Sequence, residues 1–186
     1  MGMLSIPTTA PSWRALLCAW LLACPPPSAA GAAEDALDME LRPRTPEQVS
    51  AFYAARGFPR PMVEILARHC FITVRIHNTS DRVIWLELAN WRFTAAGQTL
   101  VRQHRDEWKS RWQAMDMPLA SQSTFRWTLL PETLDFQPGE QEGGNIILPP
   151  TTAPISVQAE FATGEDKEGP VIRRRFDHLY CGQSES

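Results

Sequence analysis

The sequence has no apolar run long enough to cross a bilayer. The longest one, residues 15–23, has nine residues, whereas a membrane-spanning helix needs about 20. Arg14, the only charged residue among the first 33, precedes this run. A short apolar segment behind one positive charge is typical of a signal peptide. We therefore predict that residues 1–33 are a leader and that the protein is exported from a bacterial cytoplasm.

Two processing routes remain open for this leader. Leu21-Leu22-Ala23-Cys24 resembles a bacterial lipobox, which would place a lipid on Cys24. Alternatively, Ser28-Ala29-Ala30 or Ala30-Gly31-Ala32 has the small residues that signal peptidase requires. The predicted location is the periplasm, either free or anchored by lipid to the outer membrane. A lipid anchor would be the only predicted contact with a membrane.

Catalytic sequence signatures are also missing. There is no Gly-x-Ser-x-Gly elbow, phosphate-binding Walker loop, dinucleotide fingerprint or His-Glu-x-x-His motif. The sequence therefore predicts neither an enzyme nor a cofactor. A hydrolase whose site has no recognisable motif remains an alternative.

An excess of basic residues is absent too. The chain has 18 basic and 21 acidic side chains, a formal net charge of −3, so no nucleic-acid partner is expected. The one basic cluster, Arg173-Arg174-Arg175, lies in a strand-like segment. Successive residues of a strand point to opposite faces, so the three arginines would be divided between the two faces of the sheet. We therefore interpret the cluster as ordinary sheet surface.

Cysteine is scarce, with four residues in the chain. Cys18 and Cys24 belong to the leader region, which leaves Cys70 and Cys181 near the two ends of the remaining chain. In an exported protein this pair predicts a disulfide. The bridge would close a loop of roughly 110 residues, worth at most about 4–5 kcal/mol. A metal-binding pair or two free thiols are the alternatives.

The segment from residue 70 to residue 93 has the pattern on which the fold prediction depends. Cys70, Ile72, Val74 and Ile76 alternate with more polar residues, and a polar turn at residues 78–82 precedes a second alternating run. Alternation is typical of half-buried strands. Similar patterns predict further strands; they lie at residues 124–129, 145–148, 155–161 and 171–180.

The residues before this segment predict a tether and two helices. From Pro25 to about Arg44 the chain is rich in Pro, Ala, Gly and acidic residues, which predicts that residues 34–44 form a flexible tether after the leader. Thr45 and Gln48 then form a capping-box pattern around Pro46, which favours a helix that ends near Gly57. A second short helix is expected at residues 61–68, so residues 45–69 should form a helical cap.

These elements together predict a mainly β protein. The expected fold is an immunoglobulin-like antiparallel β-sandwich of six to seven strands over residues 70–181, preceded by two short N-terminal helices and followed by a tail at residues 182–186. Residues 104–117 have tryptophans at helical spacing, which favours a helical crossover between the sheets.

Tryptophans supply one candidate binding surface. Trp127 shares its strand face with Phe125 and Leu129 and is expected in the core. Trp85 and Trp91 should lie opposite the inward residues of their strand, where the helix that contains Trp108 and Trp112 would cover them. If the helix did not cover these tryptophans, the exposed side chains would form a binding surface for a protein partner or a glycan. This surface would consist of Trp85, Trp91, Arg92 and Trp108.

Copper is the candidate metal. Met115 and Met117 offer thioethers, which suit Cu(I), and folding could bring His77 and His178 together on facing strands. None of the four histidines, which include His69 and His104, has a partner at chelating spacing in the sequence. We therefore predict a non-enzymatic binding or assembly module that acts on another envelope component, a protein or a glycan. A periplasmic copper-binding protein is the alternative.

Overall fold

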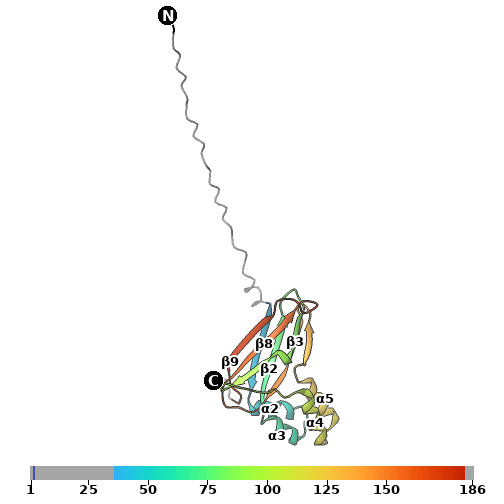
Figure 1. Ribbon diagram of the computed structural model, residues 1–186. Coiled ribbons are helices and arrows are strands. Elements are labelled where there is room, and N and C mark those ends of the chain that lie inside the picture. The colour runs from blue at the N-terminus through green and yellow to red at the C-terminus, as the bar shows by residue number, and fades with distance from the viewer. Residues whose placement is uncertain (1, 3–35, 183–186) are drawn as a thin grey trace.

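A computed structural model describes residue 2 and residues 36–182. Two antiparallel β-sheets face each other, and the helices gather at one end of them (Figure 1). The leader, the lipobox with Cys24, the alternative cleavage sites and most of the tail lie outside the described residues. Within the described part of the chain, no helix is both long and apolar enough to cross a membrane.

The smaller sheet has three strands in the order β1-β2-β7. Its members are β1 (Leu37–Arg44), β2 (Cys70–Asn78) and β7 (Gln141–Leu148). The larger sheet is built around β8 (Ile155–Thr163), which pairs with β9 along one edge and with β3 and β4 in succession along the other. Its remaining members are β3 (Ile84–Glu87), β4 (Arg92–Ala95), β5 (Gln98–Thr99), β6 (Thr133–Phe136) and β9 (Ile172–Leu179).

The main core lies between the two sheets. In β2, Ile72, Val74 and Ile76 are fully buried, and in β8 the alternate residues Val157 and Phe161 face them from the other sheet. The alternation predicted for both segments is therefore confirmed, as is the mainly β, antiparallel architecture. Nine strands, more than the six or seven expected, occur among residues 36–182. The immunoglobulin-like assignment is finer than this and stays a prediction.

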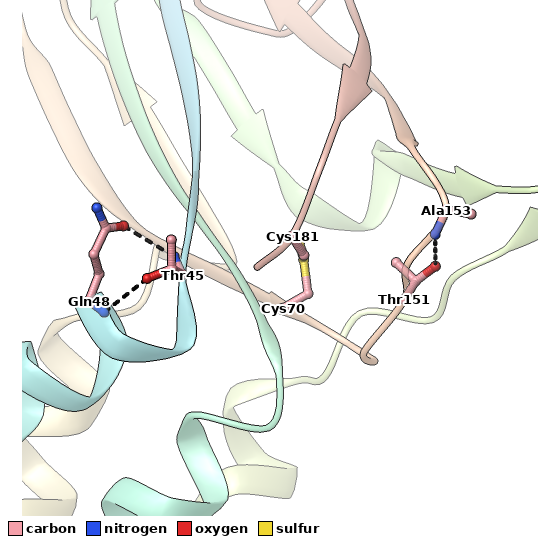
Figure 2. Close-up of a disulfide and its surroundings, with 6 residues drawn as sticks. All are labelled: Thr45, Gln48, Cys70, Thr151, Ala153 and Cys181. Carbon is pink, nitrogen blue, oxygen red and sulfur yellow. Dashed lines mark hydrogen bonds between the residues drawn. A yellow bond between two sulfur atoms is a disulfide. The ribbon is translucent and has the colours of Figure 1, made fainter. Parts of the chain in front are cut away.

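Both predicted N-terminal helices are present as α2 (Pro46–Ala54) and α3 (Arg60–Leu66). The capping box is formed (Figure 2). The backbone N–H of Gln48 donates to Thr45 Oγ1 at 3.2 Å, and the backbone N–H of Thr45 donates to Gln48 Oε1 at 3.1 Å. These two bonds satisfy amides that an uncapped helix start would leave without partners.

The structure corrects the tether expected at residues 34–44. Residues 37–44 form strand β1, which pairs antiparallel with β2 from Leu37 opposite Asn78 to Arg44 opposite Phe71. Leu37 and Leu41 are buried in the main core. The physical reason is that these leucines complete the apolar face of the smaller sheet, which outweighs the proline and the charges around them. The two helices consequently lie between the first two strands and do not precede the sandwich.

The strand expected at residues 124–129 is also wrong. Residues 119–127 form helix α5 (Leu119–Trp127), in which Phe125 is buried but Trp127 is 84% exposed. Positions two apart lie on nearly opposite sides of a helix, whereas positions four apart share a side. Phe125 therefore faces inward while Trp127 faces solvent.

The expected helix in residues 104–117 exists as α4 (Arg105–Ala114). The expected crossover between the sheets is wrong, because the strands before and after the helices α4 and α5, β5 and β6, both belong to the larger sheet. It packs with α2, α3 and α5 around a second apolar cluster at the helical end of the sandwich (Figure 1). Trp108, Trp112 and Phe125 form the centre of this cluster, with ring centroids 5.1–5.5 Å apart. Tyr53 of α2 joins them at 5.8 Å from Phe125. This cluster fixes the helices relative to one another.

A disulfide joins Cys70, at the start of β2, to Cys181, just after β9 (Figure 2). Their Cα atoms are 5.4 Å apart, within the usual range for a bridge. Because β2 and β9 belong to different sheets, the bond ties the two layers together at the helical end. The predicted pairing is confirmed.

Candidate functional site

The aromatic surface considered from the sequence is not assembled. Trp91 is buried in the main core, with its ring centroid 5.5 Å from that of Phe161, and Trp108 is buried in the helical cluster. Arg92 is exposed but has neither of these tryptophans beside it at the surface. The proposed cover is wrong as well, because the helix that contains Trp108 packs against Phe125 and not over Trp91.

A short 3-10 helix, η1 (Leu88–Asn90), explains the error. It separates β3 from β4, so the two-residue alternation of β3 does not continue to Trp91, which faces inward. Trp85 remains on the outer face of β3 and is half-buried. Its Nε1 donates to the carbonyl of Gly164 at 2.7 Å, and Lys167 Nζ lies 4.6 Å from its ring centroid. Its cover therefore comes from the β8–β9 turn.

The four candidate copper ligands do not converge. His77 lies seven residues along β2 from Cys70, roughly 23 Å at about 3.3 Å per residue. His178 precedes Cys181 by three residues and so lies at the disulfide end of the sandwich. Met115 and Met117 pack against the helical cluster. Within residues 36–182, no group of three or more His, Cys, Asp or Glu side chains could hold a metal ion.

A different feature dominates the helical end: a pocket of about 470 Å³ between α2, the outer face of the smaller sheet and the end of α5. We call it the α2–α5 pocket. Its wall comes from β2 and β7, and its rim from the last residue of β1 and the outer side of α2. Its charged and aromatic lining residues are Arg44, Phe52, Tyr53, Arg56, Phe71 and Trp127.

The pocket has a positive lining without a compensating acid. Arg44 and Arg56 both line it, and no Asp or Glu does. Arg44 Nε donates to Thr73 Oγ1 at 2.9 Å, which in turn donates to Asn145 Oδ1 at 2.8 Å. This chain of bonds orients the guanidinium and leaves its two terminal nitrogens without a bond to any described residue.

Arg56 is held in a different way. Its Nη1 donates to the carbonyl of Phe52 at 2.9 Å, and its guanidinium carbon lies 3.4 Å from the centre of the Phe52 ring. Neither Arg44 nor Arg56 forms an ion pair with a described residue. Two uncompensated cations in a concave, partly apolar site produce a positive potential that attracts anions.

Tyr53 forms the floor of the pocket and is 1% exposed. Its hydroxyl lies 2.8 Å from Thr128 Oγ1, and the Thr128 hydroxyl donates to the carbonyl of Phe125 at 2.7 Å. Because the Thr128 proton is used in that bond, Tyr53 is the donor to Thr128. Burial raises the pKa of Tyr53 to about 12, so the phenol is neutral at physiological pH and serves to fix residue 128.

Gly144 explains how the end of α5 reaches the pocket. A Cβ on this residue would lie 2.4 Å from the backbone nitrogen of Leu130. Because Gly144 has no side chain, residues 128–130 can run beside β7. Two backbone hydrogen bonds hold them there: the Asn145 N–H donates to the Thr128 carbonyl at 2.8 Å, and the Leu130 N–H donates to the Asn145 carbonyl at 3.1 Å. Trp127 is thereby placed at the rim.

Sequence reasoning missed Trp127 as a surface residue. It is the most exposed large apolar side chain among the described residues, at 84%, and Phe52 beside the pocket is 37% exposed. Tryptophan and arginine are enriched in the energetically important parts of protein interfaces. The signal that could have found it is the helical spacing of Phe125 and Leu129, which leaves position 127 outside.

Comparisons with known proteins add little to this picture. No family model matches the chain, and no curated protein matches it significantly. Among solved structures, the chain is similar to the crystal structure of a FixG-related protein from Vibrio parahaemolyticus, at 10% sequence identity and a TM-score of 0.32. The match covers 77% of this chain and 96% of that one. At this level the likeness carries no inference about function.

Proposed function

We propose that this chain is an exported, non-enzymatic binding module whose α2–α5 pocket holds an acidic segment of another envelope protein. One observation carries the proposal: two arginines, uncompensated by any lining carboxylate, lie beside a tryptophan that is 84% exposed. A carboxylate side chain would find three terminal guanidinium nitrogens there without a bond to a described residue, two of Arg44 and Nη2 of Arg56, and an apolar or aromatic neighbour would pack on Trp127.

The size and rigidity of the pocket support this proposal. Its volume of about 470 Å³ lies within the usual range for ligand sites, about 300–1,000 Å³, which is enough for one or two side chains of a partner. Arg44 is oriented by Thr73, and the floor is fixed by the bond from Tyr53 to Thr128. A site that is already ordered loses less entropy on binding.

The proposed location rests on separate grounds. The Cys70–Cys181 disulfide is compatible with a compartment outside the cytoplasm, and the leader-like residues 1–33 point the same way. We propose the periplasm, with a lipid on Cys24 as one of two outcomes of processing. Intact-mass spectrometry of the native protein distinguishes a lipidated Cys24 from a start near Ala32.

A direct test uses acidic peptides in which Glu or Asp alternates with Leu or Phe at varied spacing, with Gln and Asn counterparts as neutral probes. Binding is measured by fluorescence anisotropy with the wild type, with Arg44→Gln/Arg56→Gln and with Trp127→Ala. Arg68→Gln is the matched control, since Arg68 is exposed and does not line the pocket. Charge-assisted hydrogen bonds are worth about 1.5–3 kcal/mol, so the double variant should bind at least about ten-fold more weakly.

Four further results decide the proposal. Affinity should fall as salt rises, because exposed charges are screened, and the Arg68→Gln variant should bind like the wild type. Equal binding of acidic and neutral peptides would refute the proposal. A preference for an acidic oligosaccharide, such as oligogalacturonate, over every peptide would replace the protein partner with a glycan.

A further inference from the structure

A second cavity lies between α4 and α5, about 240 Å³ in volume and separate from the α2–α5 pocket. We call it the α4–α5 groove. Trp112 and Phe125 form its apolar floor, with their rings 5.5 Å apart and perpendicular. Leu119, which is 77% exposed, lies at its edge. The residues from each helix that line the groove recur at three- and four-residue spacing, so one face of each helix builds it.

Trp112 has an unusual feature for a buried side chain. It is 1% exposed, and its indole Nε1 is buried without a hydrogen-bond partner among the described residues. A buried donor without a partner typically costs about 1–3 kcal/mol. Because Trp112 lines the groove, an oxygen acceptor bound there would remove this cost.

The groove also has a cationic rim. Arg105, Lys109 and Arg126 line it, whereas Asp106 is its one lining carboxylate and is largely exposed. Arg105 is anchored because its Nη2 donates to the Leu129 carbonyl, and its buried Nε has no partner. The groove therefore combines an apolar floor, two buried donors without partners, and positive charge.

We propose that the α4–α5 groove binds a small monocarboxylate with an apolar body. The body lies on Trp112 and Phe125, and the carboxylate faces Arg105 and the cationic rim, where its oxygens accept from the indole N–H. The volume of about 240 Å³ equals that of roughly eight water molecules at about 30 Å³ each, which suits a short fatty acid or a single aromatic acid. This site is independent of the α2–α5 pocket.

The experiment titrates the purified, disulfide-bonded protein with octanoate and follows the indole N–H resonances by ¹⁵N-correlated NMR. Acetate, which has the charge without the apolar body, and 1-octanol, which has the body without the charge, are the matched probes. Octanoate should shift the Trp112 indole resonance in a saturable way and bind at least about ten-fold more tightly than either probe. Equal binding of octanoate and octanol, or no shift of Trp112, would overturn the proposal.

Two tryptophan variants separate the donor from its packing. Trp112→Phe keeps an aromatic ring but removes the N–H, and should weaken octanoate binding about ten-fold, as expected for a hydrogen bond to a charged group. Trp108→Phe is the control, because Trp108 Nε1 is equally buried and without a partner but Trp108 does not line the groove. Its affinity should stay within about two-fold of the wild type. An equal loss in both variants would contradict the assigned contact.

Surface variants keep the test decisive if Trp112→Phe does not fold. Lys109→Gln/Arg126→Gln changes two exposed side chains and should weaken octanoate binding several-fold, with a smaller salt dependence. Arg44→Gln/Arg56→Gln, which alters only the α2–α5 pocket, should leave octanoate binding unchanged. Loss of binding in the second variant but not the first would refute the groove as the site.

Discussion

Gly144 links the fold to the proposed pocket, and replacing it gives the most specific prediction. An alanine Cβ at this position would lie 2.4 Å from the Leu130 nitrogen, 2.6 Å from its Cα and 2.7 Å from the Leu129 carbonyl carbon. All three are backbone atoms, so no side-chain rotation can relieve the overlap. Residues 128–130 must move away from β7.

The cost can be estimated from what that movement breaks. Overpacking typically costs about 1–3 kcal/mol, and each of the two bonds between Asn145 and residues 128–130 contributes about 1 kcal/mol. We therefore expect Gly144→Ala to lower the free energy of unfolding by roughly 3–5 kcal/mol. Trp127 would shift with Thr128, so acidic peptides should also bind more weakly to the folded fraction.

Gly143 provides the matched control one residue away on the same strand. Its added Cβ would meet one atom, the Val74 carbonyl oxygen, at 3.2 Å, and glycine in a strand is itself unfavourable. Gly143→Ala should therefore change the stability by less than about 1 kcal/mol. Urea unfolding followed by circular dichroism measures both variants. If Gly144→Ala is as stable as Gly143→Ala, the close approach of residues 128–130 to β7 is refuted.

Two further predictions concern the disulfide and the pocket floor. Replacing Cys70 and Cys181 by serine should lower the free energy of unfolding by roughly 3–5 kcal/mol, because the unfolded chain loses a long covalent loop; a change below 1 kcal/mol in denaturant titration would contradict this. The pKa of Tyr53 is raised to about 12 by burial, above its ordinary value of 10. The unfolded state therefore loses this proton first, and stability should fall as pH rises from 10 to 12, by up to about 2–3 kcal/mol. Tyr53→Phe should lack that part of the pH dependence, and identical profiles for the two proteins would refute it.

Some features of the protein follow from local sequence alone. The alternation of Ile72, Val74 and Ile76 predicted β2, because a strand exposes its two faces in turn whatever it packs against. Thr45 and Gln48 predicted the start of α2, since a capping box involves only neighbouring residues. The pairing of Cys70 with Cys181 also followed, because these are the only cysteines beyond the leader region.

Other features depended on contacts between distant residues. The 3-10 helix at Leu88–Asn90 breaks the strand alternation and places Trp91 in the core. Burial of Leu37 and Leu41 stabilises a strand in a segment whose composition is typical of a tether. The segment with Phe125 and Trp127 fits either a strand or a helix by its pattern. Only packing of Phe125 on the helical cluster decided for the helix and left Trp127 outside.

Both candidate sites belong to this second group. The α2–α5 pocket draws residues from β1, α2, β2, α5 and β7, and the α4–α5 groove has no motif in either helix. Trp127 lines the same pocket as Arg44 and Arg56 because Gly144 permits residues 128–130 to run beside β7. Local pattern thus determined the buried faces of β2 and β8 and the start of α2. The charge and shape of the sites arose from side chains far apart in sequence, which long-range packing alone brings together.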